Sequence, residues 1–190
     1  MISVAVIGWI LYVLVAFVLR TLIQLRDTGS SGFVGLRPGA GMLERVAGGL
    51  MIAAFALSLV GPFVGAPLFD TALVGAIVIA LATAGTFVAQ LVMARSWRIG
   101  VDPSERTELV TRGLFAVVRN PIFSFMILAS AGMALACPTP LSLVAPLLLL
   151  VALELQVRIV EEPYLARTHG EDYLRYARRV GRFVPWVGRL

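Results

Sequence analysis

Residues 95–121 read RSWRIGVDPSERTELVTRGLFAVVRNP, a polar and basic stretch inside an otherwise apolar chain. Hydrophobic residues make up 59% of the 190 residues and charged residues only 14%, and the mean hydropathy is +0.91. Soluble globular proteins do not have this composition, so the chain is predicted to be an integral membrane protein. The stretch is too long for a simple turn between two helices. It ends in Arg119-Asn120-Pro121, which opens a new apolar run and is our first candidate for a functional site.

Five apolar windows around this stretch are long enough to cross a bilayer. They fall at about residues 2–25, 43–62, 69–94, 121–137 and 141–160. They predict an all-α integral membrane bundle of about five transmembrane helices, followed by a C-terminal interfacial helix. The fourth and fifth windows are separated only by Cys137-Pro-Thr-Pro140, so we expect a tight hairpin there. We expect residues 1–190 to form a single domain, with N-terminal spans in 1–65 and the cofactor site in 95–190.

The positive charge comes from arginine alone, because the chain has no lysine, and the formal net charge is +5. Arginines cluster after the first, third and fifth windows, whereas the N-terminus and the turns at 61–70 and 137–141 contain none. This alternation predicts that the N-terminus lies outside and that the 95–121 stretch and the C-terminus lie in the cytoplasm. The arginine bias is typical of a G+C-rich bacterial genome, so we expect the bacterial inner membrane. The net charge suits contact with anionic lipid head groups.

Cysteine and histidine are almost absent, with one residue of each. A single cysteine excludes an internal disulfide and a multi-cysteine metal site, and a single histidine argues against a polyhistidine centre. We therefore expect no metal, and no nucleic-acid partner. Trp97 and Trp186 are expected to be aromatic residues at the membrane interface.

The last apolar window carries ionisable residues. Glu154, Arg158 and Glu162 follow one another at four-residue spacing and so lie along one stripe of a helix, with Glu161 beside it. One interpretation is a structural ion pair that neutralises Glu154 inside the apolar run. The other is a polar wall of a pocket that faces the cytoplasm. The spacing alone does not choose between them.

The Arg119-Asn120-Pro121 step also has two interpretations. Asn is a preferred N-cap and Pro is favoured at the first helical position, so the step is typical of a helix start. A helix start also points free backbone N–H groups outward, where they can hold a polar ligand. Further on, the tail from Glu161 is predicted to be an amphipathic interfacial helix. Its apolar side would carry Leu165, Tyr173, Tyr176 and Val180, and its polar side Arg175, Arg178 and Arg179.

Short motifs in the C-terminal half follow one another in a recognisable order. They are SWRIGV at 96–101, ELVTRGLF at 108–115, VRNPIF at 118–123, EEPYL at 161–165 and GEDYLRY at 170–176. In this order and membrane context they resemble the isoprenylcysteine carboxyl methyltransferase family and its phospholipid methyltransferase relatives. The resemblance implies S-adenosylmethionine as the cofactor. It also implies methyl transfer to a lipophilic acceptor, with a carboxylate, thiol or amine as the receiving group, at the cytoplasmic membrane face.

The resemblance also implies a set of site residues. Those with a catalytic role would be Glu161, Glu162 and Arg167. Those that bind the cofactor would be Val110, Thr111, Gly113, Leu114, Arg119, Asn120, Pro121, Phe123, Gln156, Arg158, Leu165, Tyr173 and Tyr176. An arginine such as Arg158 or Arg167 would hold a carboxylate of the cofactor or an anionic acceptor. Two positions depart from the family pattern, because Asn120 stands where histidine is usual and Phe123 where tyrosine is usual.

Two other functions are compatible with these features. One is a membrane reductase of the sterol-reductase type that uses NADPH, although such an enzyme should offer several tyrosines or histidines near its substrate. The other is a non-catalytic membrane scaffold with a vestigial pocket, which the departures at Asn120 and Phe123 favour.

Overall fold

The computed structural model of this chain describes residues 1–34, 41–98, 100 and 108–190. Within these ranges the regular elements are helices, and an isolated parallel bridge joins Val118 to Gly181. Ile99, Val101 and Arg106 of the basic stretch, and Arg37 before the second apolar window, lie outside the described residues. The prediction of an all-α protein is confirmed.

The first long helix is α1 (Ile2–Val13), η1 (Leu14–Leu19) and α2 (Arg20–Thr28) in one run, where η1 is a π-helical turn. Then come α3 (Met42–Val60) with the 3-10 turn η2 (Gly61–Phe63), and α4 (Ala72–Met93) with the 3-10 turn η3 (Ala94–Ser96). The turn η4 (Gly113–Ala116) precedes α5 (Pro121–Ala136). The chain ends in α6 (Pro140–Gln156), the π-helical turn η5 (Val157–Glu161), α7 (Glu162–His169) and α8 (Glu171–Arg179).

Four helical segments are long and apolar enough to cross a membrane. They are Ile2–Thr28, Met42–Phe63, Ala72–Ser96 and Pro140–His169. The fifth predicted span corresponds to α5, which is apolar but has only 16 residues and is therefore about 24 Å long. A hydrocarbon core is about 30 Å thick, so α5 is short for a full crossing. The described residues thus form a membrane bundle of four long apolar helices and one shorter one.

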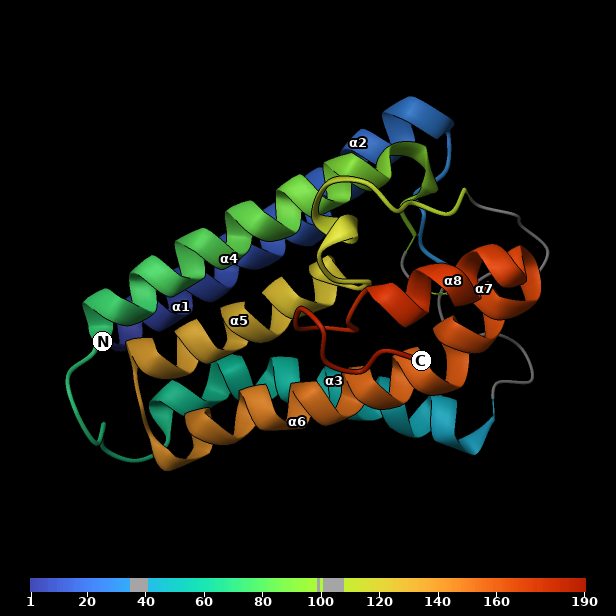
Figure 1. Cartoon of the computed structure of the whole chain (residues 1–190). Helices are drawn as coiled ribbons and strands as arrows, with labels where there is room; N and C mark the ends of the chain where they lie inside the picture. Colours follow the sequence, from blue (N-terminus) through green and yellow to red (C-terminus); the bar gives the residue numbers. More distant parts are fainter. Residues whose placement is uncertain (35–40, 99, 101–107) are drawn as a thin grey trace.

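The helices pack as two layers joined by α5 (Figure 1). The run from α1 to α2 lies along α4, α5 lies against α4, and α3 lies against α6. The contact between α4 and α5 is close because Gly75 and Gly132 have no side chain: a Cβ atom on Gly75 would lie 2.5 Å from the Cα atom of Ala136. Small residues permit such backbone approach between membrane helices. The main buried cluster lies around α5 and takes side chains from α1, α3, α4 and α6 as well.

The hairpin between α5 and α6 has a complete helix cap. The Thr139 hydroxyl accepts a hydrogen bond from the Ser142 backbone N–H, and the Ser142 hydroxyl accepts one from the Thr139 N–H. This capping box, with Pro140 at the first helical position, starts α6 directly after α5 ends. The expected tight hairpin is present.

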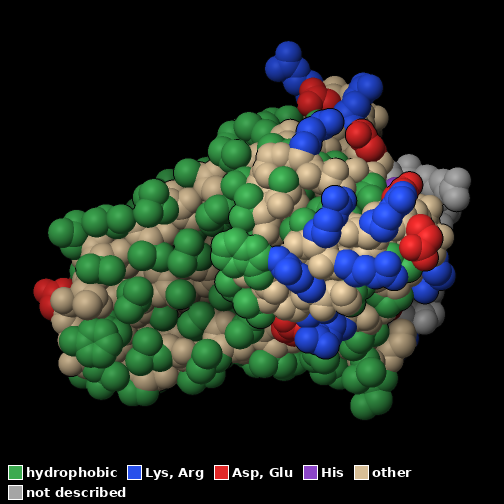
Figure 2. Space-filling model, in the orientation of Figure 1, with side chains coloured by type: hydrophobic (Ala, Val, Ile, Leu, Met, Phe, Trp, Pro, Cys, Tyr) green, Lys and Arg blue, Asp and Glu red, His purple; other side chains and the backbone are tan. Residues whose placement is uncertain are grey.

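The tail after Glu161 forms two short helices where the sequence predicted one. The helix breaks at Gly170, whose φ of 54° lies in the left-handed region that favours glycine. In α8, Tyr173 and Tyr176 are buried and the arginines are exposed, as the amphipathic pattern predicted. Figure 2 shows basic side chains gathered over the α7–α8 end, while the long helices present a mainly hydrophobic surface.

Candidate functional site

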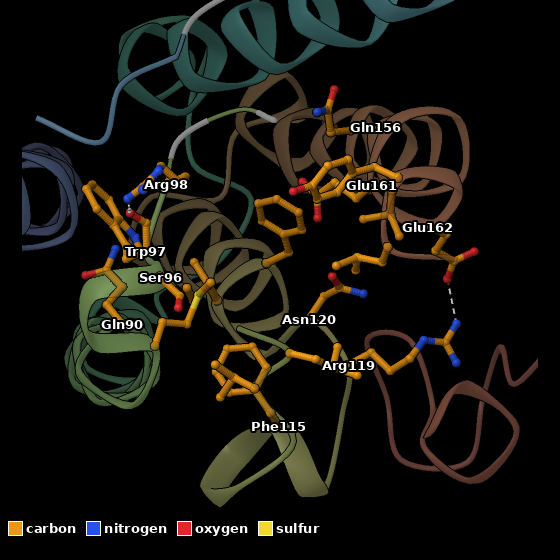
Figure 3. Close-up of a pocket in the computed structure, with 18 of the residues that line it drawn as sticks. Gln90, Ser96, Trp97, Arg98, Phe115, Arg119, Asn120, Gln156, Glu161 and Glu162 are labelled. Atoms are coloured by element: carbon orange, nitrogen blue, oxygen red, sulfur yellow. Dashed lines mark hydrogen bonds and ion pairs between the residues drawn. The ribbon is translucent and has the colours of Figure 1, made fainter. Parts of the chain in front are cut away.

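A cavity of about 250 Å³ lies at the end of the bundle where α7 and α8 pack, and both halves of the chain line it (Figure 3). Its size is close to the lower end of the usual range for small-molecule sites, roughly 300–1,000 Å³. The start of α5, the turn η5 and α8 form one side. The end of α4 with η3, and the side chains of Phe17 and Met51, form the other. Most of these lining side chains are apolar or aromatic.

Many of the residues that the sequence indicated line this cavity. They are Val110, Arg119, Asn120, Phe123, Gln156, Glu161, Glu162, Leu165, Tyr173 and Tyr176. These residues come from segments up to 66 positions apart, between Val110 and Tyr176, so the tertiary fold brings the separate motifs to one place. The remaining indicated residues lie outside the lining: Thr111, Gly113, Leu114, Pro121, Arg158 and Arg167.

The residues outside the lining occupy other places near the site. Gly113, with φ of 59°, begins the turn η4, and Leu114 packs against the apolar cluster of Ala89, Val110 and Phe115. Pro121 is buried as the first residue of α5. Arg158 and Arg167 are exposed.

A buried charge cluster borders the cavity and holds the C-terminal tail. The Glu162 carboxylate lies 2.5 Å from Nη2 of Arg119 and 2.9 Å from Nε of Arg182. The exposed fractions of these side chains are 10%, 2% and 5%, respectively. Contact with the carboxylate raises the pKa of Arg182, so its charge is held firmly.

Arg119 binds the tail as well as Glu162. Its Nη1 donates to the carbonyl oxygens of Ala177 and Val180, at 2.8 and 2.7 Å. Its Nη2 also donates to the Gly188 carbonyl, at 3.0 Å. The two terminal nitrogens of this guanidinium are therefore occupied by protein groups.

Both interpretations of the charged stripe apply, but to different residues. Glu154 forms an ion pair with Arg158, at 2.5 Å, and a second with Arg182, at 3.2 Å. It is thus part of a structural network at the edge of the charge cluster. Glu161 belongs to the cavity wall. Glu161, which lies next to the stripe, is therefore the carboxylate that faces the cavity.

Glu161 has no hydrogen-bond or ion-pair partner among the residues that the structure describes. Figure 3 shows it pointing into the cavity, whereas Glu162 points away, toward the guanidinium of Arg119. The backbone explains the difference. Pro163 has no N–H and its ring displaces the carbonyl of Ile159, so the helix opens into the π-helical turn η5 at this point. A π-helical turn contains one residue more than an α-helical turn, so the residues after it are rotated by about 100° about the helix axis. This rotation directs Glu161 into the cavity.

Asn120 occupies the N-cap position of α5, with Pro121 at the first helical position, as predicted. Its side chain makes no cap hydrogen bond. Instead, its backbone N–H donates to the Arg182 carbonyl at 3.0 Å, and its side-chain amide reaches the same oxygen only at 3.4 Å. The amide lies in the cavity wall, where it retains hydrogen-bonding capacity for a ligand.

Two tyrosines of α8 complete this side of the cavity. The Tyr176 hydroxyl donates to the Phe115 carbonyl at 2.6 Å, which ties α8 to η4. Burial, together with the negative charge of Glu162, raises the pKa of Tyr173 to about 12. Its phenol therefore keeps its proton at neutral pH and is a hydrogen-bond donor.

The opposite wall contains residues that the sequence did not indicate. Trp97 was expected at the membrane interface, but only 2% of it is exposed, and the Arg20 guanidinium lies over its ring at 4.7 Å. Gln90 donates from Nε2 to the Ala16 carbonyl at 2.8 Å. A polar residue inside an apolar window is a signal that identifies Arg20 and Gln90. No comparable signal exists for the apolar lining residues Phe17 and Met51. Within the described ranges, no group of His, Cys, Asp and Glu residues is placed to hold a metal ion.

Comparisons with known proteins place this chain in a family. Residues 51–172 match the family model described as phospholipid methyltransferase. Over 108 residues, the chain is 30% identical to Protein-S-isoprenylcysteine O-methyltransferase B of Arabidopsis thaliana. This match covers 57% of this chain and 51% of that protein. The chain therefore spans about half the length of the curated relative that it matches.

The fold is similar to a solved structure of the eukaryotic intramembrane Ras methyltransferase ICMT (isoprenylcysteine carboxyl methyltransferase). The TM-score is 0.60 at 19% sequence identity, and the match covers 90% of this chain and 61% of the other. At this identity the likeness shows a shared membrane-helical fold. It covers a larger share of this chain than the segment that matches the family model.

Proposed function

Because this chain belongs to the phospholipid methyltransferase family, we propose that it is a membrane enzyme that transfers a methyl group from S-adenosylmethionine to a lipophilic acceptor. One observation carries the proposal: the Glu161 carboxylate faces a mainly apolar cavity and has no partner among the described residues. An uncompensated carboxylate in such surroundings is unfavourable. A ligand that brings a cation or hydroxyl donors would relieve it.

The residues around the cavity fit this cofactor. Glu161 would bind its ammonium group or its ribose hydroxyls. The amide of Asn120 donates and accepts, so it would bind a carboxylate or a hydroxyl, as the histidine usual in the family would. The apolar and aromatic walls, with Phe123 among them, would cover the adenine ring. Since Arg119 and Arg182 are held by Glu162 and by the tail, we assign them to closing the site and not to binding the ligand.

Methyl transfer depends mainly on how the protein positions the acceptor relative to the methyl group. When bound, the cofactor supplies an electrophilic methyl group on a sulfonium. A lone pair on the acceptor forms the new bond to the methyl carbon as the carbon–sulfur bond breaks, and the sulfur keeps the bonding electrons. A carboxylate or thiolate is already a nucleophile, so the protein needs to align the two groups and keep water out. The buried charge cluster and the apolar walls would serve both purposes.

The membrane arrangement follows from the arginines. We propose that the N-terminus lies outside and that the cavity opens on the cytoplasmic side of a bacterial inner membrane, because the exposed arginines gather at the α7–α8 end. Anionic lipid head groups would contact this face. The lipophilic part of the acceptor would enter between the spans, along the apolar walls.

Calorimetric titration of the purified chain tests the proposal. We expect S-adenosylhomocysteine to bind, and Glu161→Gln to weaken it about tenfold, which is about 1.4 kcal/mol. Glu162 is unsuitable as a probe because its removal also breaks the charge cluster. The matched control is Glu154→Gln, which alters a carboxylate outside the cavity lining and should leave the affinity unchanged. If the wild-type chain binds neither S-adenosylmethionine nor S-adenosylhomocysteine, the proposal is wrong.

The same titration covers the other functions. Binding of NADPH in place of the adenosyl ligands would favour a reductase, and binding of none of them would favour a scaffold. Transfer of a labelled methyl group into a lipid extract, prenylcysteine analogues and small thiols would identify the acceptor.

A further inference from the structure

Arg20 is an arginine inside the first candidate span, yet it is 1% exposed and forms no ion pair among the described residues. Ionisable residues in membrane segments are rare, and they need a partner that compensates the buried charge. Here the compensation comes from an aromatic ring and from carbonyl and amide oxygens. Burial of an arginine without a carboxylate partner is energetically unfavourable, which indicates that Arg20 has a specific role.

The contacts of Arg20 converge on one turn. Its Nη2 donates to the Gln24 side chain at 2.8 Å and to the Ala94 carbonyl. Its guanidinium lies over the ring of Trp97 at 4.7 Å, which is a cation–π contact. Gln24 in turn donates from Nε2 to the Arg95 carbonyl at 3.1 Å. Two buried polar residues of α2 thus hold the turn 94–97.

This turn needs to be held. Ala94 has a φ of 48°, a left-handed conformation that side-chain-bearing residues rarely adopt unless the surroundings enforce it. The chain leaves α4 at this point and Trp97 enters the cavity wall. A hydrogen bond to the Ala94 carbonyl fixes the unusual peptide, and the stacked guanidinium fixes the indole.

Trp97 contributes an aromatic ring to the cavity wall opposite Glu161. In Figure 3 it lies with Ser96 and Gln90 on one side, while Asn120 and Glu161 lie across the cavity from it. Phe17 and Met51, from the N-terminal spans, line the cavity as well. Arg20 and Gln24 precede residue 51, where the match to the family model begins, so they lie outside the matched segment.

We propose that Arg20, assisted by Gln24, is a positioning residue that fixes Trp97 as the wall against which the lipophilic part of the acceptor binds. This inference rests on the proposed function, because it assigns the Glu161 end of the cavity to the cofactor and the Trp97 end to the acceptor. It divides the cavity by segment: the N-terminal helix sets the acceptor end, and the motifs of the C-terminal half set the cofactor end.

A protein with Trp97 as its single tryptophan, made by Trp9→Phe and Trp186→Phe, tests the proposal in nanodiscs. The probe is 12-bromododecanoic acid, whose bromine quenches tryptophan fluorescence on contact. We expect saturable quenching of Trp97 in the parent protein, and at least fivefold weaker binding in Arg20→Met, with Trp97 emission moved to longer wavelength. Affinity for S-adenosylhomocysteine, measured by calorimetry, should change less than twofold.

The controls separate positioning from general stability. Arg26→Gln changes an exposed arginine on the same helix and should alter nothing. A protein that retains only Trp186, which is 75% exposed, reports quencher that is merely dissolved in the lipid. If Arg20→Met does not fold, Arg20→Lys and Gln24→Met serve in its place. Lysine keeps the charge but lacks the planar group, so it should restore only part of the binding.

The results distinguish the positioning role of Arg20 from the proposed methyltransferase function. Equal losses of quencher and S-adenosylhomocysteine binding would mean that Arg20 only supports the fold, and would overturn this inference. Unchanged quenching in Arg20→Met, or in both substitutes, would overturn it as well. If the parent protein binds no adenosyl ligand but still shows Arg20-dependent quenching, the proposed function fails and the positioning of Trp97 stands.

Discussion

The carboxylate of Glu162 is shared by two buried arginines, so its charge is compensated within the protein. Its neighbour Glu161 has no such compensation and faces the cavity. The two adjacent glutamates therefore have different roles. Glu162 holds the C-terminal tail against the start of α5, whereas Glu161 remains available to a ligand. Substitution of Glu162 should therefore lower the stability of the fold, whereas substitution of Glu161 should lower the affinity for a ligand.

Glu162→Ala should mainly destabilise the fold. It leaves the guanidinium groups of Arg119 and Arg182 buried without their carboxylate, and breaking a buried ion pair in this way costs about 3–5 kcal/mol. Thermal unfolding of the purified protein, with and without the substitution, measures the loss. Glu154→Ala is the control, because Glu154 is 32% exposed and its pairs should be worth less than about 1 kcal/mol. Equal stability of the two variants would contradict the structural role of Glu162.

Among the elements, the π-helical turn η5 has the clearest consequence. It lies in the continuous helix that runs from α6 into α7, and it contributes Val157 and Glu161 to the cavity wall. The other π-helical turn, η1, contributes Phe17. π-Helical turns are rare and are found frequently at functional sites. In this chain, both of the described ones line the same cavity.

Pro163→Ala should close η5 into a regular α-helix. The new N–H can donate to the Ile159 carbonyl, and the one-residue shift then turns Glu161 away from the cavity. We expect affinity for S-adenosylhomocysteine to fall about tenfold, or about 1.4 kcal/mol. Thermal stability should fall as well, because the same rotation moves Glu162 away from Arg119 and Arg182. Pro146→Ala is the matched control, since Pro146 lies inside α6 and does not line the cavity. An unchanged affinity in Pro163→Ala would show that η5 does not depend on the proline.

The whole bundle depends on helices that approach at backbone distance. A Cβ atom on Gly75 would lie 2.3 Å from the Ala136 backbone nitrogen, and one on Gly85 would lie 2.4 Å from the ring of Phe125. Within lipid, helix association relies on such close packing because the hydrophobic effect between helices is small. The position of α5, and with it the position of Asn120, is set by these contacts with α4.

Gly75→Ala should therefore separate α4 from α5. The added methyl group meets backbone atoms that cannot move independently, so we expect a loss of roughly 1–3 kcal/mol or more in the free energy of unfolding. Gly49→Ala makes the same chemical change in α3 where nothing lies within 4 Å, and it should be neutral or stabilising by about 0.5–1 kcal/mol. Denaturation of both variants in the same detergent measures the difference. A neutral Gly75→Ala would mean that the two helices are not in backbone contact.

Much of the fold could be predicted from the sequence because its signals are local. Apolar windows set the long helices, and the Asn120-Pro121 step marked the first residue of α5. The windows also marked α5, which with 16 residues is shorter than the other predicted spans. The break of the tail at Gly170 was missed because a glycine inside a helical pattern is not always a helix end.

The sequence by itself determined that this chain is a helical membrane bundle, and it marked the segments that bear the candidate site. Only the tertiary structure decided which charged groups meet. The partner of Arg119 is Glu162, 43 positions away, and not a ligand or a nearby acid. Trp97 is buried beneath Arg20, which is 77 positions earlier in the chain. Hydropathy and helix caps act within a few residues, whereas the pairing of buried charges depends on how separate helices pack, which no local pattern records.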